Sequence, residues 1–538
     1  MTRERVYMPD NTKELQRAAL HKGIWAAAEE LRGSVDGWDF KQYVLGMLFY
    51  RFISENLTRS INENEWASGL TDFDYAKLDD ETAKLGREEA IKDKGFFILP
   101  SELFENVRAN AKNDKNLNET LEKVFNNIEE SSVEGDAAGD LQGLFDELDV
   151  NSKKLGDTVE KRNKKLLALM NAIGNIDFGG NYQDNAIDTF GDAMEYLMTM
   201  YASSAGKSGG EFYTPQEVGT LLAKIALNGR NEIFRGYDAC CGSAGLLLSL
   251  IKEVREKDEK GRWDNHVKGG LFGQEINLTS YNLARMNMFL HDVPFDKFDI
   301  AYGDTLTDPQ HWDYEPFDAI VSNVPFSIDW EGDNNPLLID DPRFSPAGVL
   351  APKSAADLAF TMHMLNWLSV DGTAAIVQFP GVLYRSKAEQ KIRAYMVENN
   401  FVDAVIQLPE NLFFGTNIST AILVLKKSKS DNNVLFINAS AECVKVGNKN
   451  KLSSENIETI YKLYSNREDV DYKAKLVDCE AILKNDANLS VSSYVEKEDT
   501  REKIDIVALN ARIAEIVAEQ AVLRKAVDDI VAELEGSN

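Results

Sequence analysis

Apolar residues recur at helical spacing through the first third of the chain. Between residues 11 and 165 they return every three to four positions, and Tyr43 to Ile61 is a strong run of this kind. A later stretch, residues 127–150, holds many Asp and Glu residues and no Lys or Arg, which is typical of a solvated segment. The pattern predicts a helical N-terminal region, and its expected role is packing or protein contact.

The pattern changes near residue 171 and then alternates short apolar strands with helices as far as residue 425. Such alternation is typical of an α/β fold around a mostly parallel sheet. The strands that we expect are Phe234–Asp238, Leu271–Glu275, Ile300–Asp304, Ala319–Ser322, Ala374–Phe379 and Ala404–Leu408. A final pair, Thr420–Leu425 and Val434–Asn438, is expected to form an antiparallel edge. The expected helices are Leu246–Lys257, Leu278–Leu290 and Asp357–Ser369, the last ended by Asp371-Gly372.

The clearest periodicity lies in the tail, between Glu498 and Leu534. Its core positions follow an unbroken spacing of three and four residues: Ile506, Leu509, Ile513, Ile516, Gln520, Leu523, Val527, Ile530 and Leu534. Spacing of this kind is typical of a coiled coil or of a helix in a helix bundle. The tail therefore predicts a helix that docks on a partner helix. The alternative is a terminal helix that folds onto its own chain.

A chain of 538 residues exceeds one ordinary hydrophobic core, so we expect two or three domains. The patterns divide it into a helical N-terminal domain (1–165), an α/β catalytic domain (166–485) and a C-terminal helical tail for subunit docking (486–538). The net charge of −29 does not suit a protein that grips DNA alone, because neutralising phosphates needs a basic surface. Either the substrate is not nucleic acid, or a basic partner brings the DNA.

Nothing in the composition indicates a membrane, a metal site or disulfide bonds. No apolar run approaches the ~20 residues of a membrane span, and the first residues lack the apolar core of a signal peptide. The cysteines form no C-x-x-C pair, and the histidines make no ligand cluster. We therefore expect a cytoplasmic protein with no membrane contact, no bound zinc and no disulfides.

The most informative motif is Asn323-Val324-Pro325-Phe326, at the predicted end of a strand. The Asn oxygen and the next backbone carbonyl can accept both hydrogens of a planar amino group, while the aromatic ring stacks on the base that carries it. This is the arrangement needed to methylate an exocyclic amine. Such loops usually read Asn-Pro-Pro-aromatic, and here Val324 stands at the first proline.

Two glycine-rich segments precede this motif. The first offers backbone amides and a hydroxyl to a carboxylate at a helix N-terminus, and its candidates are Gly210, Glu211, Phe212, Tyr213, Thr214 and Pro215. It is equally an ordinary turn before a helix that begins with proline. The second is a strand-to-helix loop, and its candidates are Asp238, Gly242, Ser243, Ala244 and Gly245. Its small residues allow the backbone to approach a cofactor, its acid can bind an ammonium group, and the absence of G-x-G-x-x-G disfavours NAD.

Two acids end the next predicted strands. Glu275 suits the two hydroxyls of a ribose, and Asp304 can accept a hydrogen bond from an adenine amino group. Taken singly, each is equally a helix cap or a surface acid. Together, a carboxylate clamp and acids for an ammonium, a ribose and an adenine describe S-adenosyl-L-methionine at the ligand-binding edge of an open α/β sheet. The amine-binding loop beside them predicts methyl transfer.

Glu211–Pro215, Asp238–Gly245 and Asn323–Phe326 resemble the motifs of N6-adenine DNA methyltransferases. The closer resemblance is to the modification (M) subunits of type I restriction–modification systems. Further segments that carry this resemblance are Leu31–Leu45, Asp357–Phe360, Gly381–Arg385 and Leu408–Thr416, so it runs over nearly the whole chain.

The resemblance implies a Rossmann-like, S-adenosylmethionine-dependent methyltransferase domain with a helical N-terminal domain and a coiled-coil-like C-terminal helix. It implies methyl transfer to N6 of an adenine flipped out of DNA, with the Asn323 motif as the catalytic group. It also implies two M subunits around one DNA-reading specificity (S) subunit, joined by a restriction (R) subunit for cleavage. The S subunit would then supply much of the DNA affinity that the acidic chain lacks, and the tail would dock on S.

Two residues depart from the family pattern. Val324 keeps the carbonyl but loses the fixed φ of proline and adds an N–H, and Ala244 adds a methyl group where glycine is common. Two other functions stay open: a methyltransferase of a protein glutamine amide or of RNA, and a non-catalytic cofactor-binding scaffold. The loop Asp329–Leu350 is expected either to close over flipped DNA or to be an ordinary surface loop.

Overall fold

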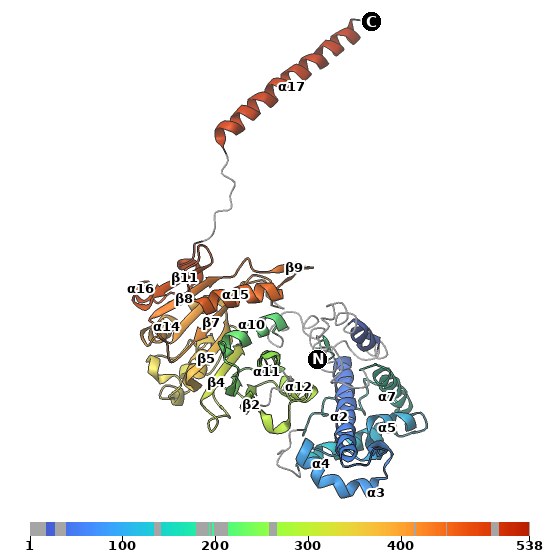
Figure 1. Cartoon of the computed structure of the whole chain (residues 1–538). Helices are drawn as coiled ribbons and strands as arrows, with labels where there is room; N and C mark the ends of the chain where they lie inside the picture. Colours follow the sequence, from blue (N-terminus) through green and yellow to red (C-terminus); the bar gives the residue numbers. More distant parts are fainter. Residues whose placement is uncertain are drawn as a thin grey trace, which may run out of the picture. The chain divides into compact units, whose positions relative to one another are not determined.

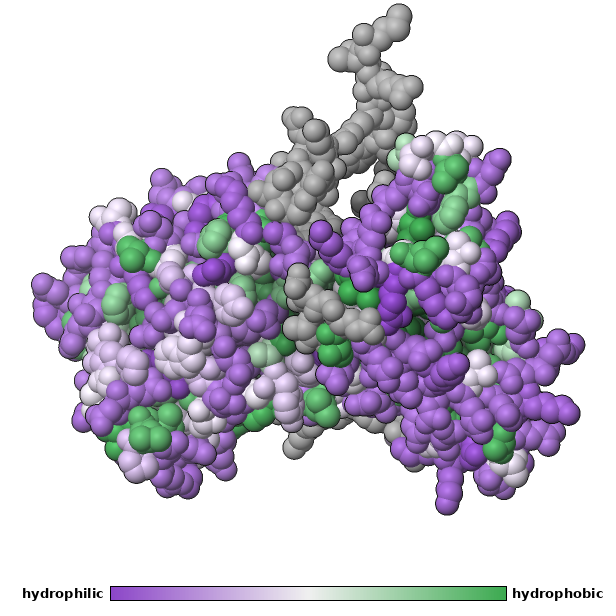
Figure 2. Space-filling model, turned by 90° about the horizontal axis from the view of Figure 1, so that it is seen from below, coloured by the Kyte–Doolittle hydropathy of each residue, from purple (hydrophilic) through white to green (hydrophobic). Residues whose placement is uncertain are grey.

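The computed structural model of the chain (Figure 1) describes residues 18–26, 39–133, 141–178, 193, 196–197, 214–257, 266–413, 416–447, 449–496 and 505–536. The chain divides into two compact units, Met1–Val495 and Glu496–Asn538. The face shown in Figure 2 is mostly hydrophilic, with hydrophobic residues scattered over it. Within the described ranges, no helix combines the length and the apolar character that crossing a membrane requires.

The N-terminal part of the first unit is helical and packs around one long helix. Its α-helices are α2 (Asp39–Ala67), α3 (Asp80–Ala83), α4 (Arg87–Lys94), α5 (Phe104–Ala111), α6 (Leu117–Val133) and α7 (Val159–Gly174). Short 3₁₀ turns are η1 (Tyr75–Lys77), η2 (Lys84–Gly86) and η3 (Pro100–Glu102). Arg51 of α2 is buried and donates from Nη1 to the carbonyls of Ile173 (2.6 Å) and Ile176 (2.8 Å), which ties α2 to the end of α7.

The rest of the first unit is built on a nine-stranded sheet with the order β11-β8-β6-β7-β5-β4-β1-β2-β3. Its strands are β1 (Ile233–Asp238), β2 (Val267–Glu275), β3 (Phe298–Tyr302), β4 (Phe317–Asn323), β5 (Leu368–Gln378), β6 (Val402–Gln407), β7 (Ala421–Leu425), β8 (Asn433–Asn438) and β11 (Ala474–Asp478). Neighbouring strands are parallel except at β7 and β11. A separate hairpin pairs β9 (Val444–Val446) with β10 (Lys449–Lys451).

Helices cover both faces of this sheet (Figure 1). They are α10 (Gln216–Leu227), α11 (Gly245–Lys257), α12 (Leu278–Leu290), α13 (Asp357–Trp367), α14 (Ala388–Glu398), α15 (Ser454–Asn466) and α16 (Cys479–Lys484). The 3₁₀ turns are η6 (Phe295–Lys297), η7 (Gly332–Asn334), η8 (Pro336–Leu338), η9 (Ser345–Ala347), η10 (Pro380–Leu383) and η11 (Val491–Ser493). Successive β4 residues alternate between two cores: Ala319 and Val321 join the core of α10–α12, and Ile320 joins that of α13 and α14.

The α/β prediction is confirmed, but the expected antiparallel edge is wrong. β7 lies inside the sheet, antiparallel to both β5 and β6, and β8 pairs parallel with β6. The antiparallel edge strand is β11, which was not predicted from the sequence. All five β7 residues are buried. A strand that is apolar on both faces reads the same in either direction, so its pattern does not reveal its partners.

The expected helix end at Asp371-Gly372 is also wrong. α13 ends at Trp367, and β5 begins at Leu368, whose backbone is already extended. Between the pairs Phe317–Leu368 and Ala319–Thr373 the register of β4 and β5 shifts. The Asp-Gly pair therefore lies in a bulge within β5, where turn-forming residues are also favoured.

The acidic segment expected to be solvated is in part a packing surface. Leu141, Leu144, Phe145 and Leu148 are buried, and Phe145 stacks on a ring of α6. Backbone carbonyls of the same segment accept hydrogen bonds from α12: Arg285 Nη2 donates to Gln142 (3.0 Å) and Asn282 Nδ2 to Gly143 (3.1 Å). The helical region is thereby joined to the methionine-rich helix that follows β2. The acidic side chains concealed an apolar pattern.

The described part of the second unit, residues 496 and 505–536, contains the helix α17 (Ile506–Glu535). It is capped by Asp505, whose Oδ1 accepts from the backbone N–H groups of Val507 and Ala508. It spans the predicted heptads. Every residue of α17 is exposed. The heptad positions form an apolar stripe along the helix, and of these Ile506, Leu523 and Leu534 are 67%, 68% and 69% exposed.

Candidate functional site

The end of β4 places Asn323 at the carboxyl edge of the sheet, between β1 and β5. Asn323 Nδ2 donates a hydrogen bond of 3.0 Å to Thr214 Oγ1. Asn323 Oδ1 is buried and has no hydrogen-bond partner among the described residues. A buried oxygen without a partner costs about 1–3 kcal/mol, so this atom is suited to accept a donor from outside the protein.

The loop after Asn323 is held at its far end by an acid. The backbone N–H of Ser327, whose φ of 53° is left-handed, donates to both carboxylate oxygens of Asp357 at 3.1 and 3.0 Å. Burial raises the pKa of Asp357, the first residue of α13. The ring of Phe326 lies 6.1 Å from that of Phe379, at 44°. Thr214 and Asp357 therefore fix the two ends of the motif.

Asp238 ends β1 directly beside this motif and is fully buried. Its Oδ1 accepts from Ser322 Oγ at 2.7 Å and from the backbone N–H of Cys240 at 3.0 Å. Its Oδ2 is buried with no hydrogen-bond partner among the described residues. Burial raises the pKa of Asp238 to about 7. Since Ser322 precedes Asn323, one hydrogen bond links Asp238, the predicted cofactor acid, to the strand that carries the Asn323 motif.

The loop after Asp238 makes a tight left-handed turn. Gly242 has a φ of 52° and donates its N–H to Glu275 Oε2 at 3.0 Å. Ala244 has a φ of 62°, which costs an L-residue roughly 1–2 kcal/mol. Its methyl group is fully buried in the core of α10–α12 and does not line the cavity described below. Ser243, also buried, accepts from Asn287 Nδ2 of α12 through its carbonyl (2.7 Å).

The other two predicted acids stand at neighbouring strand ends. Glu275, the last residue of β2, accepts from the backbone N–H of Asn277 (2.8 Å), and burial raises its pKa. Asp304 lies just after β3 and accepts from the N–H of Leu306 (2.9 Å) and the hydroxyl of Thr307 (2.8 Å). Each carboxylate oxygen has lone pairs for further donors. Both acids keep acceptor capacity toward the cavity that they line.

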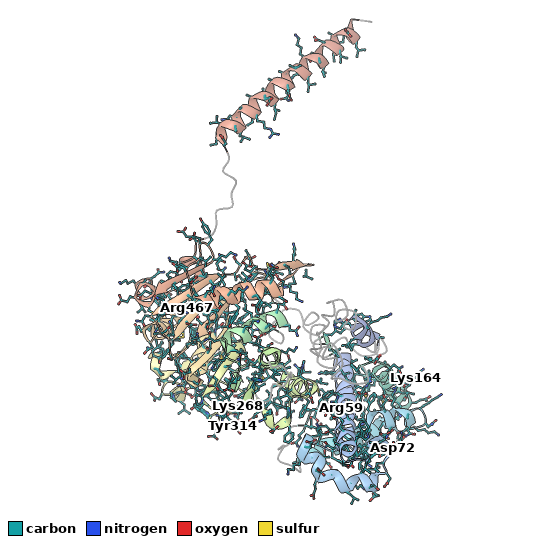
Figure 3. The ribbon with its side chains drawn as sticks, viewed as in Figure 1. Arg59, Asp72, Lys164, Lys268, Tyr314 and Arg467 are labelled. Carbon is teal, nitrogen blue, oxygen red and sulfur yellow. The ribbon has the colours of Figure 1, made fainter. Side chains whose placement is uncertain are left out.

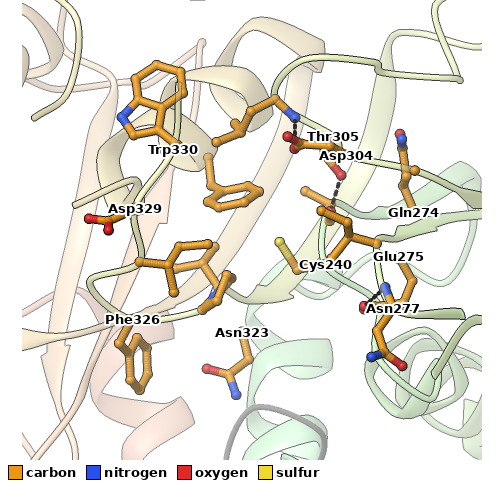
Figure 4. A pocket seen from close by; sticks show the side chains of 18 of the residues that line it. Cys240, Gln274, Glu275, Asn277, Asp304, Thr305, Asn323, Phe326, Asp329 and Trp330 are labelled. Atoms are coloured by element: carbon orange, nitrogen blue, oxygen red, sulfur yellow. Dashed lines mark hydrogen bonds between the residues drawn. The ribbon is translucent and has the colours of Figure 1, made fainter. Parts of the chain in front are cut away.

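These strand ends enclose one cavity of about 430 Å³ (Figure 4). Its lining includes Asn323, Val324, Pro325, Phe326, Glu275, Asp304, Cys240, Ile276, Leu306, Asp329, Trp330 and Phe360. Among the described residues that line it there are acids but no Lys or Arg. A nucleotide phosphate is therefore disfavoured, whereas a ligand with hydroxyls, a flat ring and a positive charge suits the lining.

The structure brings most of the predicted site residues together, in different ways. The Asn323 motif, Glu275 and Asp304 line the cavity, and Asp238, Gly242, Ser243, Ala244 and Gly245 form the loop behind it. Thr214 contacts Asn323, and Pro215 is the N-cap of α10. Gly210, Glu211, Phe212 and Tyr213 lie outside the described residues. The apolar lining residues Ile276 and Leu306 were missed, although each directly follows a strand-end acid or its turn.

A buried arginine behind the cavity was also not predicted from the sequence. Arg343, 2% exposed, donates to the carbonyls of Thr305 (Nη1, 2.8 Å) and Leu306 (Nη2, 2.7 Å) and pairs with Asp341 at 2.8 Å. It also donates to His363 Nδ1 at 3.2 Å. Burial and the neighbouring guanidinium lower the pKa of His363, so its neutral ring donates from Nε2 to Tyr237 Oη. This network ties the loop after the Asn323 motif to the turn that carries Asp304.

Comparison with known proteins decides between the open functions. A family model described as N-6 DNA Methylase matches residues 185–503, more than half of the chain. The chain belongs to the N-6 DNA methylase family. A second model, described as the HsdM N-terminal domain, matches residues 20–173 of this methylase.

Its relatives identify the class of methylase. It is 44% identical over 537 residues to the methylase subunit of the type I restriction enzyme MpnII of Mycoplasma pneumoniae, covering 96% of this chain and 97% of that one. The solved type I restriction–modification methyltransferase subunit of Streptococcus thermophilus is 36% identical, with a TM-score of 0.79, over 89% of this chain and all (100%) of that one. The chain is thus a DNA adenine methyltransferase and a type I methylase subunit.

Proposed function

We propose that the cavity holds a flipped adenine against Asn323-Val324-Pro325-Phe326, with S-adenosylmethionine beside it. The observation that carries the proposal is the buried Asn323 Oδ1, which has no hydrogen-bond partner in the described part of the chain and whose amide is oriented by Thr214. This oxygen and the Val324 carbonyl each accept a hydrogen bond from the N6 amino group, which leaves the nitrogen lone pair directed toward the methyl group of the cofactor. Val324 is 2% exposed and packed in the core, so packing holds the carbonyl where proline would fix it.

The energetics suit a reaction that depends on orientation. Extruding an adenine from the duplex costs a few kcal/mol, and stacking on Phe326 returns about 1–3 kcal/mol. S-adenosylmethionine supplies an electrophilic methyl group when bound. Since the electrophile is strong, holding the amine in line provides most of the rate, and the Asn323 motif needs no dedicated base.

The proposed cofactor contacts follow from the donors and acceptors at the strand ends. Asp238 Oδ2, buried and unpartnered among the described residues, accepts from the ammonium group. Glu275 accepts from the ribose hydroxyls and Asp304 from the adenine amino group, with Ile276 and Leu306 on the ring. Thr214 accepts from Asn323 and so has its own O–H to donate to the methionine carboxylate, together with the backbone N–H groups of the candidates Gly210–Tyr213. Pro215 has no N–H to donate, and its part would be to cap α10 beside the carboxylate. One hydroxyl would then contact both the cofactor and the residue that holds the target amine.

Cofactor binding is expected to depend on pH through Asp238. The ammonium group needs the carboxylate, whereas burial raises the pKa of the free acid to about 7. Below that pH each unit should weaken S-adenosylmethionine about tenfold, since one proton must leave. Without cofactor, raising the pH has the opposite effect on the stability of the fold. Folded Asp238 keeps its proton up to about pH 7, whereas the unfolded chain loses it near pH 4. The free energy of unfolding therefore falls as the pH rises from about 4 to 7.

Calorimetric titration of the cofactor at several pH values checks this expectation. Asp238→Asn is the matched control: its affinity should be weak and the same at every pH. A wild-type affinity that does not change between about pH 5 and pH 8 contradicts the assignment of Asp238.

We propose three functional parts: a helical N-terminal domain (1–165), the methyltransferase domain (166–485) and a docking tail (486–538). Two such subunits would flank one S subunit, which brings the DNA, and an R subunit would join for cleavage. The support is the acidic chain, the relatives' type I names and the exposed apolar stripe of α17. The loop Asp329–Leu350 is not suited to close over DNA, because it carries several acids and a single cation, Arg343, and would repel the phosphates.

The tail gives a direct test of assembly. Ile516→Asp with Leu523→Asp puts two charges on the stripe and is expected to abolish co-purification with a tagged, co-expressed S subunit. Ala518→Asp, two positions off the stripe, should leave co-purification intact. Cofactor affinity should not change in either variant. Full co-purification of the double variant would rule out docking through this stripe.

A further inference from the structure

The segment Gly381–Arg385 carries part of the family resemblance, yet the chemistry above does not use it. It forms η10 and the turn between β5 and α14, at the carboxyl edge of the sheet. Tyr384 is 57% exposed, the side chain of Arg385 is 38% exposed, and Lys387 is exposed. An aromatic ring and two cations thus follow one another on the surface.

Arg385 lies against Phe379, the neighbour of the ring that is proposed to stack on the target adenine. Its guanidinium carbon lies 5.7 Å from the centroid of Phe379, and Phe379 lies 6.1 Å from Phe326. Gly381 permits this position, because a Cβ there would stand 2.7 Å from the guanidinium. An ion pair of 3.5 Å with Glu389 holds the other side.

Lys387 occupies a backbone conformation that favours glycine. Its φ of 66° and ψ of −125° are those of the first central residue of a type II′ turn, where glycine is preferred. Strained positions of this kind cluster at functional sites. Lys387 forms no ion pair with the described residues, and Lys391, four residues later on α14, is also exposed. The charge of Lys387 is therefore available to a ligand.

Two acids near this segment are engaged. Glu389 pairs with Arg385, and Asp357, which also feels the Arg385 charge, accepts the N–H of Ser327. A chain of net charge −29 thus exposes Tyr384 and Lys387 in the same short segment as Arg385, which contacts the Phe379 ring beside Phe326. Phosphate contacts need such cations, and unpaired bases stack on aromatic rings.

We propose that Tyr384, Arg385 and Lys387 bind the DNA strand that carries the flipped adenine. The two cations contact phosphates that flank the target nucleotide, and Tyr384 lies against the neighbouring base or sugar. The proposal rests on the proposed function, because the adenine beside Phe326 determines which strand passes this surface.

The test uses the complex with a co-expressed S subunit, and bulk unmethylated bacterial DNA as the substrate. For Lys387→Gln, the KM for DNA should rise severalfold, and the slope of log KM against log salt should fall by about 1. The kcat at saturating DNA and the cofactor affinity should not change. Tyr384→Ala should raise the KM for DNA more than Tyr384→Phe. Lys268→Gln is the matched control. Lys268 (labelled in Figure 3) lies near the start of β2, at the amino ends of the strands and away from the carboxyl edge that carries the site.

Lys387→Gly separates a structural role from DNA contact. Glycine relieves the backbone strain, so its melting temperature should be higher than that of the wild type, while the KM for DNA rises as in Lys387→Gln. An unchanged KM and salt slope in both Lys387 variants would overturn the proposal. Its failure is distinct from failure of the proposed function, in which Asn323→Ala would still methylate DNA.

Discussion

Asn323→Ala is expected to lower methyl transfer by about 10³-fold or more, with cofactor affinity within about threefold of the wild type. The change removes the buried Oδ1, which no described residue contacts by a hydrogen bond, and the Nδ2 that donates to Thr214. Without that acceptor the adenine amine loses its orientation, on which a reaction with a strong electrophile depends. Single-turnover incorporation of labelled methyl groups into DNA measures the first quantity, and calorimetry the second.

Two variants sharpen this result. Asn323→Asp keeps an acceptor oxygen, loses the donor to Thr214 and adds a negative charge, so it should be less active than the wild type and more active than Asn323→Ala. Thr214→Val removes the group that orients the amide and should lower kcat by about 10–10²-fold. Methyl transfer by Asn323→Ala at the wild-type rate would refute the role of Asn323, whatever the cofactor affinity.

The sequence predicted the strands and acids of the site because both are local features. An apolar run that ends in Asp238 or Glu275 has the form of a parallel strand with a ligand group at its carboxyl end. Once several such strands are parallel, their ends share one edge, and the cavity follows. The motif beginning at Asn323 was recognisable for the same reason, since its chemistry lies in consecutive residues.

What escaped prediction depends on contacts between distant residues. The apolar pattern of β7 does not predict its position inside the sheet, because all five of its residues are buried and the two faces of the strand look alike. Thr214 reaches Asn323 across 109 residues, and Arg343 reaches the carbonyl of Thr305 across 38. A polar residue in a loop carries no local sign that it will be buried. Only the folded chain shows the partners that pay for its desolvation.

Arg343→Met should produce the largest loss of stability, about 3–5 kcal/mol in the free energy of unfolding. The guanidinium is 2% exposed and serves Asp341, two carbonyls and His363. Methionine fills much of the volume but leaves these acceptors buried without a donor. Chemical denaturation measures the loss. Arg343→Lys keeps the charge but cannot reproduce the planar fork, so its loss should be smaller.

A second measurement distinguishes a general loss of stability from an effect on the site. The carbonyls that Arg343 binds belong to Thr305 and Leu306, which line the cavity beside Asp304. S-adenosylmethionine affinity of folded Arg343→Met should therefore fall about tenfold, through loosening of this turn. Arg393→Met is the matched control, since Arg393 is equally buried and donates to the carbonyls of Val382 and Ala487, which do not line the cavity. If both variants lose stability and neither loses cofactor affinity, Arg343 stabilises the fold without positioning Asp304.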